Sequence, residues 1–207
     1  MEVKKTSPVL YIILRPIFTV IFKLIFNPKY INKEVIPKKG ACVIAGNHMH
    51  ALDPIMVDTS TRRVIYTLAK KDLHDGPFGF LFKGVGSIPV DFSKKENRGA
   101  LYTAIAYLQD GYAINLSPEA GRNYTEEILL PFKPGAVVMS QRTNCPIIPY
   151  SVTGEYKFRS KNLTICYGEP MTFEGMSVEE ANQKLYDAVK ELLIKNKYNN
   201  AGENYEY

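Results

Sequence analysis

The stretch ACVIAGNHMHALDPI (residues 41–55) contains, in order, an apolar run, a polar loop and a helix start. The run over 41–46 has the length and composition of a short buried strand. Asp53 and Pro54 are typical of a helix start, with a side-chain oxygen at the N-cap and proline at the first helical position. The stretch therefore predicts a strand, a loop and a helix in succession, which is the repeating unit of an α/β domain.

The same alternation continues along the chain. It predicts one α/β domain with a mostly parallel central sheet flanked by helices. Further strands are expected over 63–70, 87–91, 112–117, 145–154 and 162–170, a short helix or turn over 78–86, and helices over 94–111, 133–144 and 177–197.

The helix over 177–197 carries the clearest signals. It opens with a capping box of Ser177 and Glu180. Its spacing predicts a buried face, made of Ala181, Leu185, Ala188 or Val189, and Leu192.

Composition favours a single globular domain. The chain has 207 residues, of which 45% are hydrophobic and 23% charged. We expect the domain over 31–198 and a frayed tail over 199–207. The net charge of +5 suits phosphates or an anionic membrane surface, and we expect no nucleic-acid partner. An odd number of cysteines predicts reduced packing thiols in a cytosol-facing protein, at Cys42, Cys145 and Cys166.

The N-terminal segment PVLYIILRPIFTVIFKLIF (8–26) is apolar apart from Arg15, Thr19 and Lys23. These residues recur every four positions, so a helix places them on one side, opposite a broad apolar face. A charge at the centre of a membrane-spanning helix costs ~2.5–3.5 kcal/mol, which argues against a spanning helix. We therefore expect residues 1–30 to lie at the cytosolic face of a membrane, with both charges reaching lipid phosphates. A core helix packed on the domain is the alternative.

The loop after the first strand contains His48, His50 and Asp53. A histidine acts as a general base near neutral pH when a carboxylate fixes its tautomer and stabilises the imidazolium. A tight turn could bring Asp53 to His48 in this way. Two other interpretations remain open, namely Asp53 as a helix cap alone and a metal site of all three residues. Because no G-x-S-x-G motif is present and no cysteine adjoins a basic residue, we expect the substrate to supply the attacking hydroxyl.

The stretch SPEAGRN (117–123) also follows an expected strand, so it should face the same crevice as the histidine loop. Its small Ala-Gly pair lets the backbone approach a ligand closely. Arg122 is suited to grip a phosphate with its forked donors. Lys133, ahead of an expected helix, is a second anion-binding candidate. The alternative is a surface turn with a Glu119–Arg122 pair contributing under ~1 kcal/mol.

Four segments together resemble the motifs of the glycerolipid acyltransferases, the 1-acylglycerol-3-phosphate acyltransferase family. NHMHALD (47–53) has the N-H-x-x-x-x-D form of the first motif. GSIPVD (86–91) is similar to the second motif, SPEAGR (117–122) to the third and CPIIPYSV (145–152) to the fourth. Their order and spacing agree over roughly residues 40–168.

This resemblance implies that His48 is the general base on the free hydroxyl of a lysophosphatidate. That hydroxyl would attack an acyl thioester of CoA or acyl carrier protein. Asp53 would orient His48, while Glu119 and Arg122 would shape the acceptor site, with Arg122 toward the glycerol phosphate. The resemblance implies no metal and no prosthetic group, and membrane phospholipids as partners. The expected substrate-binding set is completed by Asn47, Gly121, Lys70 and Lys133.

The chain departs from the family pattern in two motifs. The second motif normally ends in an arginine, where this chain has Phe92. Lys94, Lys95 or Arg98 would then have to hold the phosphate, or the acceptor differs. In the third motif, Ala120 stands where glycine is usual. Two alternatives therefore remain, a metal-dependent phosphoester hydrolase built on the histidine loop and a non-catalytic lipid-binding relative.

Overall fold

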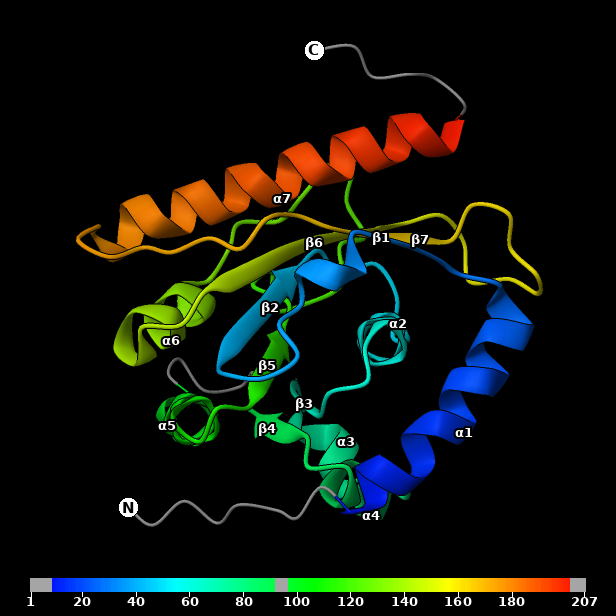
Figure 1. Cartoon of the computed structure of the whole chain (residues 1–207), viewed down its shortest axis with the longest axis horizontal. Helices are drawn as coiled ribbons and strands as arrows, with labels where there is room; N and C mark the ends of the chain where they lie inside the picture. The colour runs from blue at the N-terminus through cyan, green and yellow to red at the C-terminus, as the bar shows by residue number, and fades with distance from the viewer. Residues whose placement is uncertain (1–8, 92–96, 202–207) are drawn as a thin grey trace.

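The computed structural model describes residues 9–91 and 97–201, and a seven-stranded sheet forms the centre of this part of the chain (Figure 1). The strands are β1 (Lys29–Ile31), β2 (Cys42–Gly46), β3 (Ile65–Lys70), β4 (Ile88–Val90), β5 (Ala113–Leu116), β6 (Ile147–Thr153) and β7 (Thr164–Tyr167). Their order in the sheet is β1-β7-β6-β2-β5-β3-β4.

The sheet is mostly parallel, which confirms the predicted fold class. Strand β2 pairs in parallel with β5 on one side and with β6 on the other. Strands β3 and β4 extend the parallel part beyond β5. Strand β7 runs antiparallel to β6, and β1 pairs in parallel with β7. The carboxyl ends of β2, β3, β4, β5 and β6 therefore share one edge, where binding sites of α/β domains form.

Helices cover both faces of the sheet, which gives a three-layer domain (Figure 1). Val43 and Ala45 of β2 pack toward one helical layer, and Cys42 and Ile44 toward the other, because successive strand residues point to opposite faces. The first layer contains α5 (Arg98–Gln109), α6 (Gly135–Thr143) and α7 (Val178–Ala201), and the second α1 (Val9–Phe26) and α2 (Asp53–Ser60). The shorter helices are η1 (Lys33–Val35), α3 (Lys71–Asp75) and α4 (Gly79–Gly84).

Helix α7 begins with the predicted capping box. The Glu180 N–H donates to the Ser177 hydroxyl at 3.2 Å, and the Ser177 N–H donates to the Glu180 carboxylate at 3.0 Å. The Ser177 hydroxyl also donates to the Glu180 carboxylate, at 2.8 Å, and the two bonds to the carboxylate hold the pKa of Glu180 below its usual range. The buried face follows a spacing of four residues, so Leu193 takes the place predicted for the partly buried Leu192; the face is Ala181, Leu185, Val189 and Leu193.

Two expected boundaries differ from the structure. Strand β1 pairs with β7, so the sheet already includes residues before 31. Helix α7 continues to Ala201, so residues 199–201 are helical rather than part of a tail. Residues 202–207 of the expected tail lie outside the described part of the chain.

The start of α2 corrects the interpretation of Asp53 as an N-cap. Asp53 is the first helical residue, Leu52 occupies the N-cap position, and the described structure contains no side-chain bond that caps this helix. Pro54 lies in the first turn, where it was expected. The Asp53 carboxylate does not cap the helix because it accepts hydrogen bonds from the preceding loop.

Helix α1 presents its polar side to the domain and its apolar side outward. The Tyr11 hydroxyl donates to Asp58 Oδ1 at 3.0 Å, and Arg15 Nε donates to the Asp58 backbone carbonyl at 3.0 Å. Arg15 is thus turned away from the outward side, contrary to the prediction that it reaches lipid phosphates. Lys23 is exposed, with Nζ 5.3 Å from the ring centroid of Tyr30. The exposed apolar side chains of α1 are Val9, Ile12, Ile13, Ile17, Phe18, Val20, Ile21, Leu24 and Ile25.

Among the described residues, α1 is the one helix that is long and apolar enough to cross a membrane, with a mean hydropathy of 2.2. Only 11% of it is buried in the protein. By its length and composition, this helix could anchor the protein to a membrane.

Candidate active site

His48 and Asp53 form a hydrogen-bonded pair beyond the carboxyl end of β2. His48 Nδ1 and Asp53 Oδ2 are 2.9 Å apart. The Asp53 side chain is 1% exposed and the His48 side chain 23% exposed, so the ring can be reached from outside. Because Asp53 occupies Nδ1, Nε2 is the ring nitrogen left to take a proton from a bound molecule. This is the geometry of a general base and its orienting carboxylate.

The Asp53 carboxylate organises the loop that contains His48. Besides its bond to His48, Oδ2 accepts the backbone N–H groups of Met49 and His50, each at 2.8 Å. Oδ1 accepts the hydroxyl of Tyr156 at 2.7 Å. These donors satisfy the buried carboxylate, so its orientation is fixed before a substrate binds.

The two residues before His48 attach this loop to β6. A Cβ at Gly46 would lie 2.3 Å from the Tyr150 carbonyl oxygen, so the close approach of β2 to β6 requires glycine. The buried Asn47 side chain donates to the Val152 carbonyl at 3.0 Å and accepts the Val152 N–H at 2.7 Å. Asn47, a predicted substrate-binding residue, therefore has both ends of its amide bonded to β6.

Glu119 joins the loop after β5 to the loop after β2. Its Oε1 accepts the His48 N–H at 2.8 Å, and its Oε2 accepts the Leu130 N–H at 2.7 Å. Asn123 N–H donates to the His48 carbonyl at 3.0 Å. Burial raises the pKa of Glu119, and the two N–H donors oppose that rise. The predicted meeting of the two stretches is confirmed, and it holds His48 by both of its backbone polar groups.

The residues that follow Glu119 shape an open, basic flank of the site. Ala120 has a φ of 56°, in the left-handed region that favours glycine. A Cβ at Gly121 would meet nothing within 4 Å, so the space beside its backbone is free of protein atoms. Arg122 is exposed, with Cζ 5.3 Å from the ring centroid of Tyr124. Arg122 directly precedes Asn123, whose backbone N–H donates to the His48 carbonyl.

The other predicted basic residues have different surroundings. Lys70 ends β3, and its Nζ lies 2.6 Å from the Asp72 carboxylate. Lys133 is exposed, and its backbone N–H donates to the Pro118 carbonyl at 2.9 Å, which ties it to the third-motif loop. Arg98 is exposed at the start of α5. The other two candidates, Lys94 and Lys95, lie outside the described residues, as does Phe92, which replaces the usual arginine.

His50 points away from the pair. Its ring stacks on Tyr156 with centroids 4.3 Å apart, and its Nδ1 accepts the Leu52 N–H at 3.2 Å. The third histidine, His74, is buried and lies 2.9 Å from Ser87 Oγ. Over residues 9–91 and 97–201, no three His, Cys, Asp or Glu side chains are grouped so that they could hold a metal ion. His50 is therefore not grouped with His48 and Asp53 as a set of metal ligands in the described structure.

Tyr156 is a site residue that the sequence does not indicate. It lies in the connection between β6 and β7, 103 residues from Asp53, and no motif includes it. Phe22 and Phe26 of α1 pack edge-on against its ring, with centroids 6.3 and 5.7 Å away. Burial, together with the nearby Asp53, raises the pKa of the Tyr156 hydroxyl, so it remains a donor at neutral pH.

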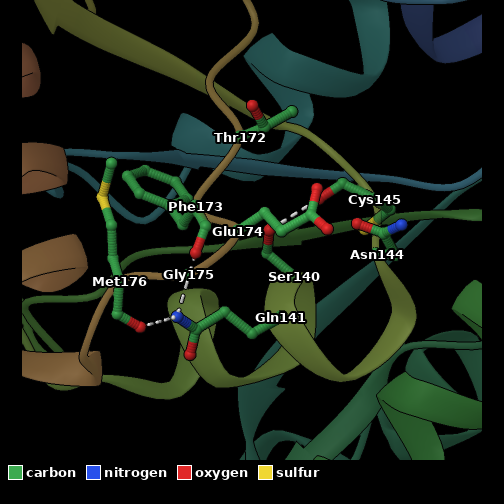
Figure 2. A pocket seen from close by; sticks show the side chains of 9 residues that line it. All are labelled: Ser140, Gln141, Asn144, Cys145, Thr172, Phe173, Glu174, Gly175 and Met176. Atoms are coloured by element: carbon green, nitrogen blue, oxygen red, sulfur yellow. Dashed lines mark hydrogen bonds between the residues drawn. The ribbon is translucent and has the colours of Figure 1, made fainter.

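A cavity of about 380 Å³ lies elsewhere, between the end of α6 and the segment that precedes α7 (Figure 2). Gln141 crosses between its walls by donating to the carbonyls of Phe173 at 3.2 Å and Met176 at 2.9 Å. Cys145, just before β6, also lines it. The cavity is therefore at the amino end of β6 and is separate from the His48 site.

Comparisons with known proteins all find similarity to acyltransferases. A family model described as Acyltransferase matches residues 27–153. The 1-acyl-sn-glycerol-3-phosphate acyltransferase of Borreliella burgdorferi is 31% identical over 132 residues, which are 63% of this chain and 52% of that protein. The Saccharomyces cerevisiae protein of the same name is 33% identical over 135 residues, 60% of this chain and 42% of that protein.

A solved structure has the same fold. The crystal structure of the 1-acyl-sn-glycerophosphate (LPA) acyltransferase PlsC from Thermotoga maritima aligns with a TM-score of 0.72 at 21% identity. It covers 88% of this chain and 77% of that chain. The chain spans about half of the length of these curated relatives. The matched region contains His48, Asp53, Glu119 and Arg122, whereas Tyr156 lies beyond it.

Proposed function

This chain belongs to the acyltransferase family, and from that membership and the His48 site we propose that it acylates a lysophospholipid. The proposed reaction moves a fatty acyl group from a thioester to the free hydroxyl of 1-acylglycerol-3-phosphate and yields phosphatidate. The matched family region, residues 27–153, contains His48 and Asp53. Two similar proteins carry this activity in their names.

The 2.9 Å contact between His48 Nδ1 and Asp53 Oδ2 carries the proposal. His48 Nε2 takes the proton of the acceptor hydroxyl as its oxygen attacks the thioester carbonyl. Asp53 stabilises the imidazolium that forms. The carbon–sulfur bond then breaks, a carbon–oxygen ester bond remains, and the proton passes from His48 to the departing thiolate.

Transfer is proposed to be direct, without an acyl-enzyme. All three cysteines are free, and burial raises the pKa of each thiol, to about 11 for Cys42. A thiol with a raised pKa is a poor nucleophile at neutral pH. The attacking oxygen is therefore assigned to the acceptor, which the base can reach at the carboxyl edge of the sheet.

Arg122 is proposed to bind the acceptor phosphate. It is exposed, it carries the forked donors that match phosphate geometry, and its neighbour Asn123 bonds to His48. The open space at Gly121 would let the acceptor lie against the backbone beside it. Glu119 is proposed to shape the site through the backbone rather than to contact the substrate, because its two oxygens accept N–H groups.

The acceptor is a lipid, and α1 is proposed to hold the protein at the membrane that contains it. The outward apolar side of α1 is suited to insert among acyl chains while its polar side stays bonded to the domain. The donor is proposed to be a thioester of CoA or acyl carrier protein, delivered from the cytosolic face. The three free cysteines agree with a reducing compartment.

Thiol release from palmitoyl-CoA tests the function directly, with and without lysophosphatidate. Release that requires the acceptor and falls by about 10²–10⁴-fold in His48→Ala is expected of a general base. His50→Ala is the matched control. Turnover within about threefold of the native protein is expected, because the His50 ring bonds the Leu52 N–H and alanine keeps the backbone N–H that donates to Asp53.

The alternatives predict other results. A phosphoester hydrolase would release phosphate, lose activity to a chelator and suffer equally from both histidine substitutions. A non-catalytic relative would bind vesicles containing lysophosphatidate but release no thiol with any acceptor or with a carrier-protein donor. Acceptor-independent thiol release would count against direct transfer.

A further inference from the structure

Tyr156 connects the helix proposed to meet the membrane with the carboxylate that orients the base. On one side its hydroxyl donates to Asp53 Oδ1 at 2.7 Å. On the other side its ring packs against Phe22 and Phe26 of α1. Its face is covered by the ring of His50. The residue lies outside the region that the family model matches.

We propose that Tyr156 is a positioning residue, which fixes the Asp53 carboxylate and is itself held in place by the inner side of α1. The expected effect of Tyr156 on turnover rests on the proposed function. Its geometric basis, the contact of Tyr156 with Asp53 and α1, is independent of which acceptor is used.

The hydroxyl contributes through the two oxygens of one carboxylate. Oδ2 of Asp53 bonds His48 and two backbone N–H groups, while Tyr156 is the donor described for Oδ1. Removing that donor leaves Oδ1 buried without its partner and leaves more negative charge to attract the imidazolium. His48 should then hold its proton to higher pH, and it should act as a base over a narrower range.

The other groups around the pair do not replace this donor. Glu119, from the β5–α6 connection, accepts the His48 backbone N–H. Tyr150, from β6, faces Asp53 as a buried neutral hydroxyl, and burial raises the pKa of that hydroxyl. His50, from the same loop as His48, contributes its backbone N–H to Oδ2 and stacks on Tyr156. In the described structure, two titratable side chains hydrogen-bond directly to the Asp53 carboxylate, namely His48 and Tyr156.

Helix α1 supports Tyr156 with one side and presents the other side outward. Phe26 is half-buried and packs with its ring 4.9 Å from Phe22 and 5.7 Å from Tyr156. Phe18, two turns earlier on the same helix, is 48% exposed. The same substitution at these two positions therefore distinguishes the effect of losing a contact with Tyr156 from the effect of losing an outward apolar side chain.

The first experiment compares Tyr156→Phe with Tyr30→Phe in the full chain. Tyr30 is a matched control because its hydroxyl bonds Thr59 Oγ1 at 2.8 Å and not the carboxylate. The chain has three histidines, so their ring signals can be followed by NMR against pH, with His48 assigned by its loss in His48→Gln. Tyr156→Phe is expected to raise the His48 titration midpoint by roughly 0.5 pH unit, and Tyr30→Phe to leave it unchanged.

The turnover profile supplies a second readout. The acid limb of kcat against pH is expected to move upward with the NMR midpoint in Tyr156→Phe, and kcat at neutral pH to fall by up to about threefold, the most that a shift of this size allows. The acceptor KM should stay within about twofold, because Tyr156 acts through Asp53 and not on the acceptor. A purely structural hydroxyl would lower the unfolding temperature in both variants and move neither profile.

The second experiment compares Phe26→Ala with Phe18→Ala. Phe26→Ala is expected to shift the His48 midpoint in the same direction as Tyr156→Phe, and Phe18→Ala to leave the midpoint unchanged. An unmoved midpoint in Tyr156→Phe would overturn the positioning role, and equal midpoints in the two phenylalanine variants would overturn the support by α1. Since NMR needs no turnover, an inactive native protein would count against the proposed function alone.

Discussion

The backbone N–H of His48 donates to the buried carboxylate of Glu119 at 2.8 Å, across 71 residues of sequence. The second oxygen of Glu119 accepts the Leu130 N–H at 2.7 Å. One carboxylate therefore joins the loop of His48 to the loop that contains Arg122. This structural role requires two acceptor oxygens on the Glu119 side chain. It does not require Glu119 to transfer a proton.

Glu119→Gln should disturb both stability and turnover. The amide has one oxygen, so one of the two backbone N–H groups would face an NH₂ and lose its acceptor, at a cost of about 1–3 kcal/mol. Turnover should fall about tenfold as His48 loses its backbone anchor. Thermal unfolding and thiol release would measure these effects, with the exposed Glu127→Gln of the same loop as control. Equal behaviour of the two variants would contradict the role of Glu119.

Arg122→Ala should weaken acceptor binding. Loss of a charge-assisted, two-pronged grip on a phosphate is expected to raise the lysophosphatidate KM by about 10–100-fold, with little change in the thioester KM. Arg142→Ala is a matched control, since Arg142 also lies over a tyrosine ring, that of Tyr102 at 5.9 Å, but on α6. An unchanged acceptor KM in Arg122→Ala would contradict the phosphate assignment.

Gly121→Ala separates substrate contact from folding. The added methyl would meet no protein atom within 4 Å, so the free energy of unfolding should change by less than about 0.5 kcal/mol. If the acceptor lies against this backbone, its KM should rise severalfold. Kinetics with lysophosphatidate and a thermal melt decide the question, and a native KM would place the acceptor elsewhere.

Outward substitutions on α1 should release the protein from membranes. Val20 and Leu24 are 58% and 63% exposed, and replacing both by glutamine keeps helix propensity while removing apolar surface. Co-sedimentation with anionic vesicles should fall at least about tenfold. Tyr102→Gln, at an exposed position of α5, is the control and should sediment like the native protein. Undiminished sedimentation of the α1 variant would refute the proposed membrane contact.

Asp58 should make stability depend on pH. Burial raises the pKa of its carboxyl to about 7, well above the value of about 3.9 of an unfolded aspartate. The group therefore favours the folded state most at low pH, and that contribution is lost as pH rises from about 4 through 7, by up to ~4 kcal/mol. Asp58→Asn removes this titration, so the stability of the native protein relative to the variant should decline between pH 4 and 7. Chemical unfolding at several pH values measures the decline, and parallel curves would contradict it.

The sequence predicted the fold class and the central pair because both depend on local pattern. Apolar runs alternating with helical spacing predict strands and helices in an α/β domain, and the sheet confirms this. His48 and Asp53 are five residues apart, so a single turn brings them together. The N-cap interpretation of Asp53 was wrong because a carboxylate beside a helix start can bond the preceding loop instead.

Other features depended on which surfaces meet. Periodicity placed Arg15 on the polar side of α1, but only packing on α2 showed that this side faces the domain. Motif similarity singled out Asn47, yet its amide is bonded to Val152, 105 residues later.

The sequence by itself determined the alternation of strands and helices from residue 41 onward, the acyltransferase motifs and the proximity of His48 to Asp53. These follow from spacing within a few residues of the chain. The short elements β1, η1 and α3 were not predicted. Only the tertiary structure decided that Glu119 anchors the backbone of His48 and that Tyr156 links α1 to Asp53, because those contacts join residues 71 and 103 apart. Contacts at that separation form only when strands that are distant in sequence lie together in one sheet, so no local pattern encodes them.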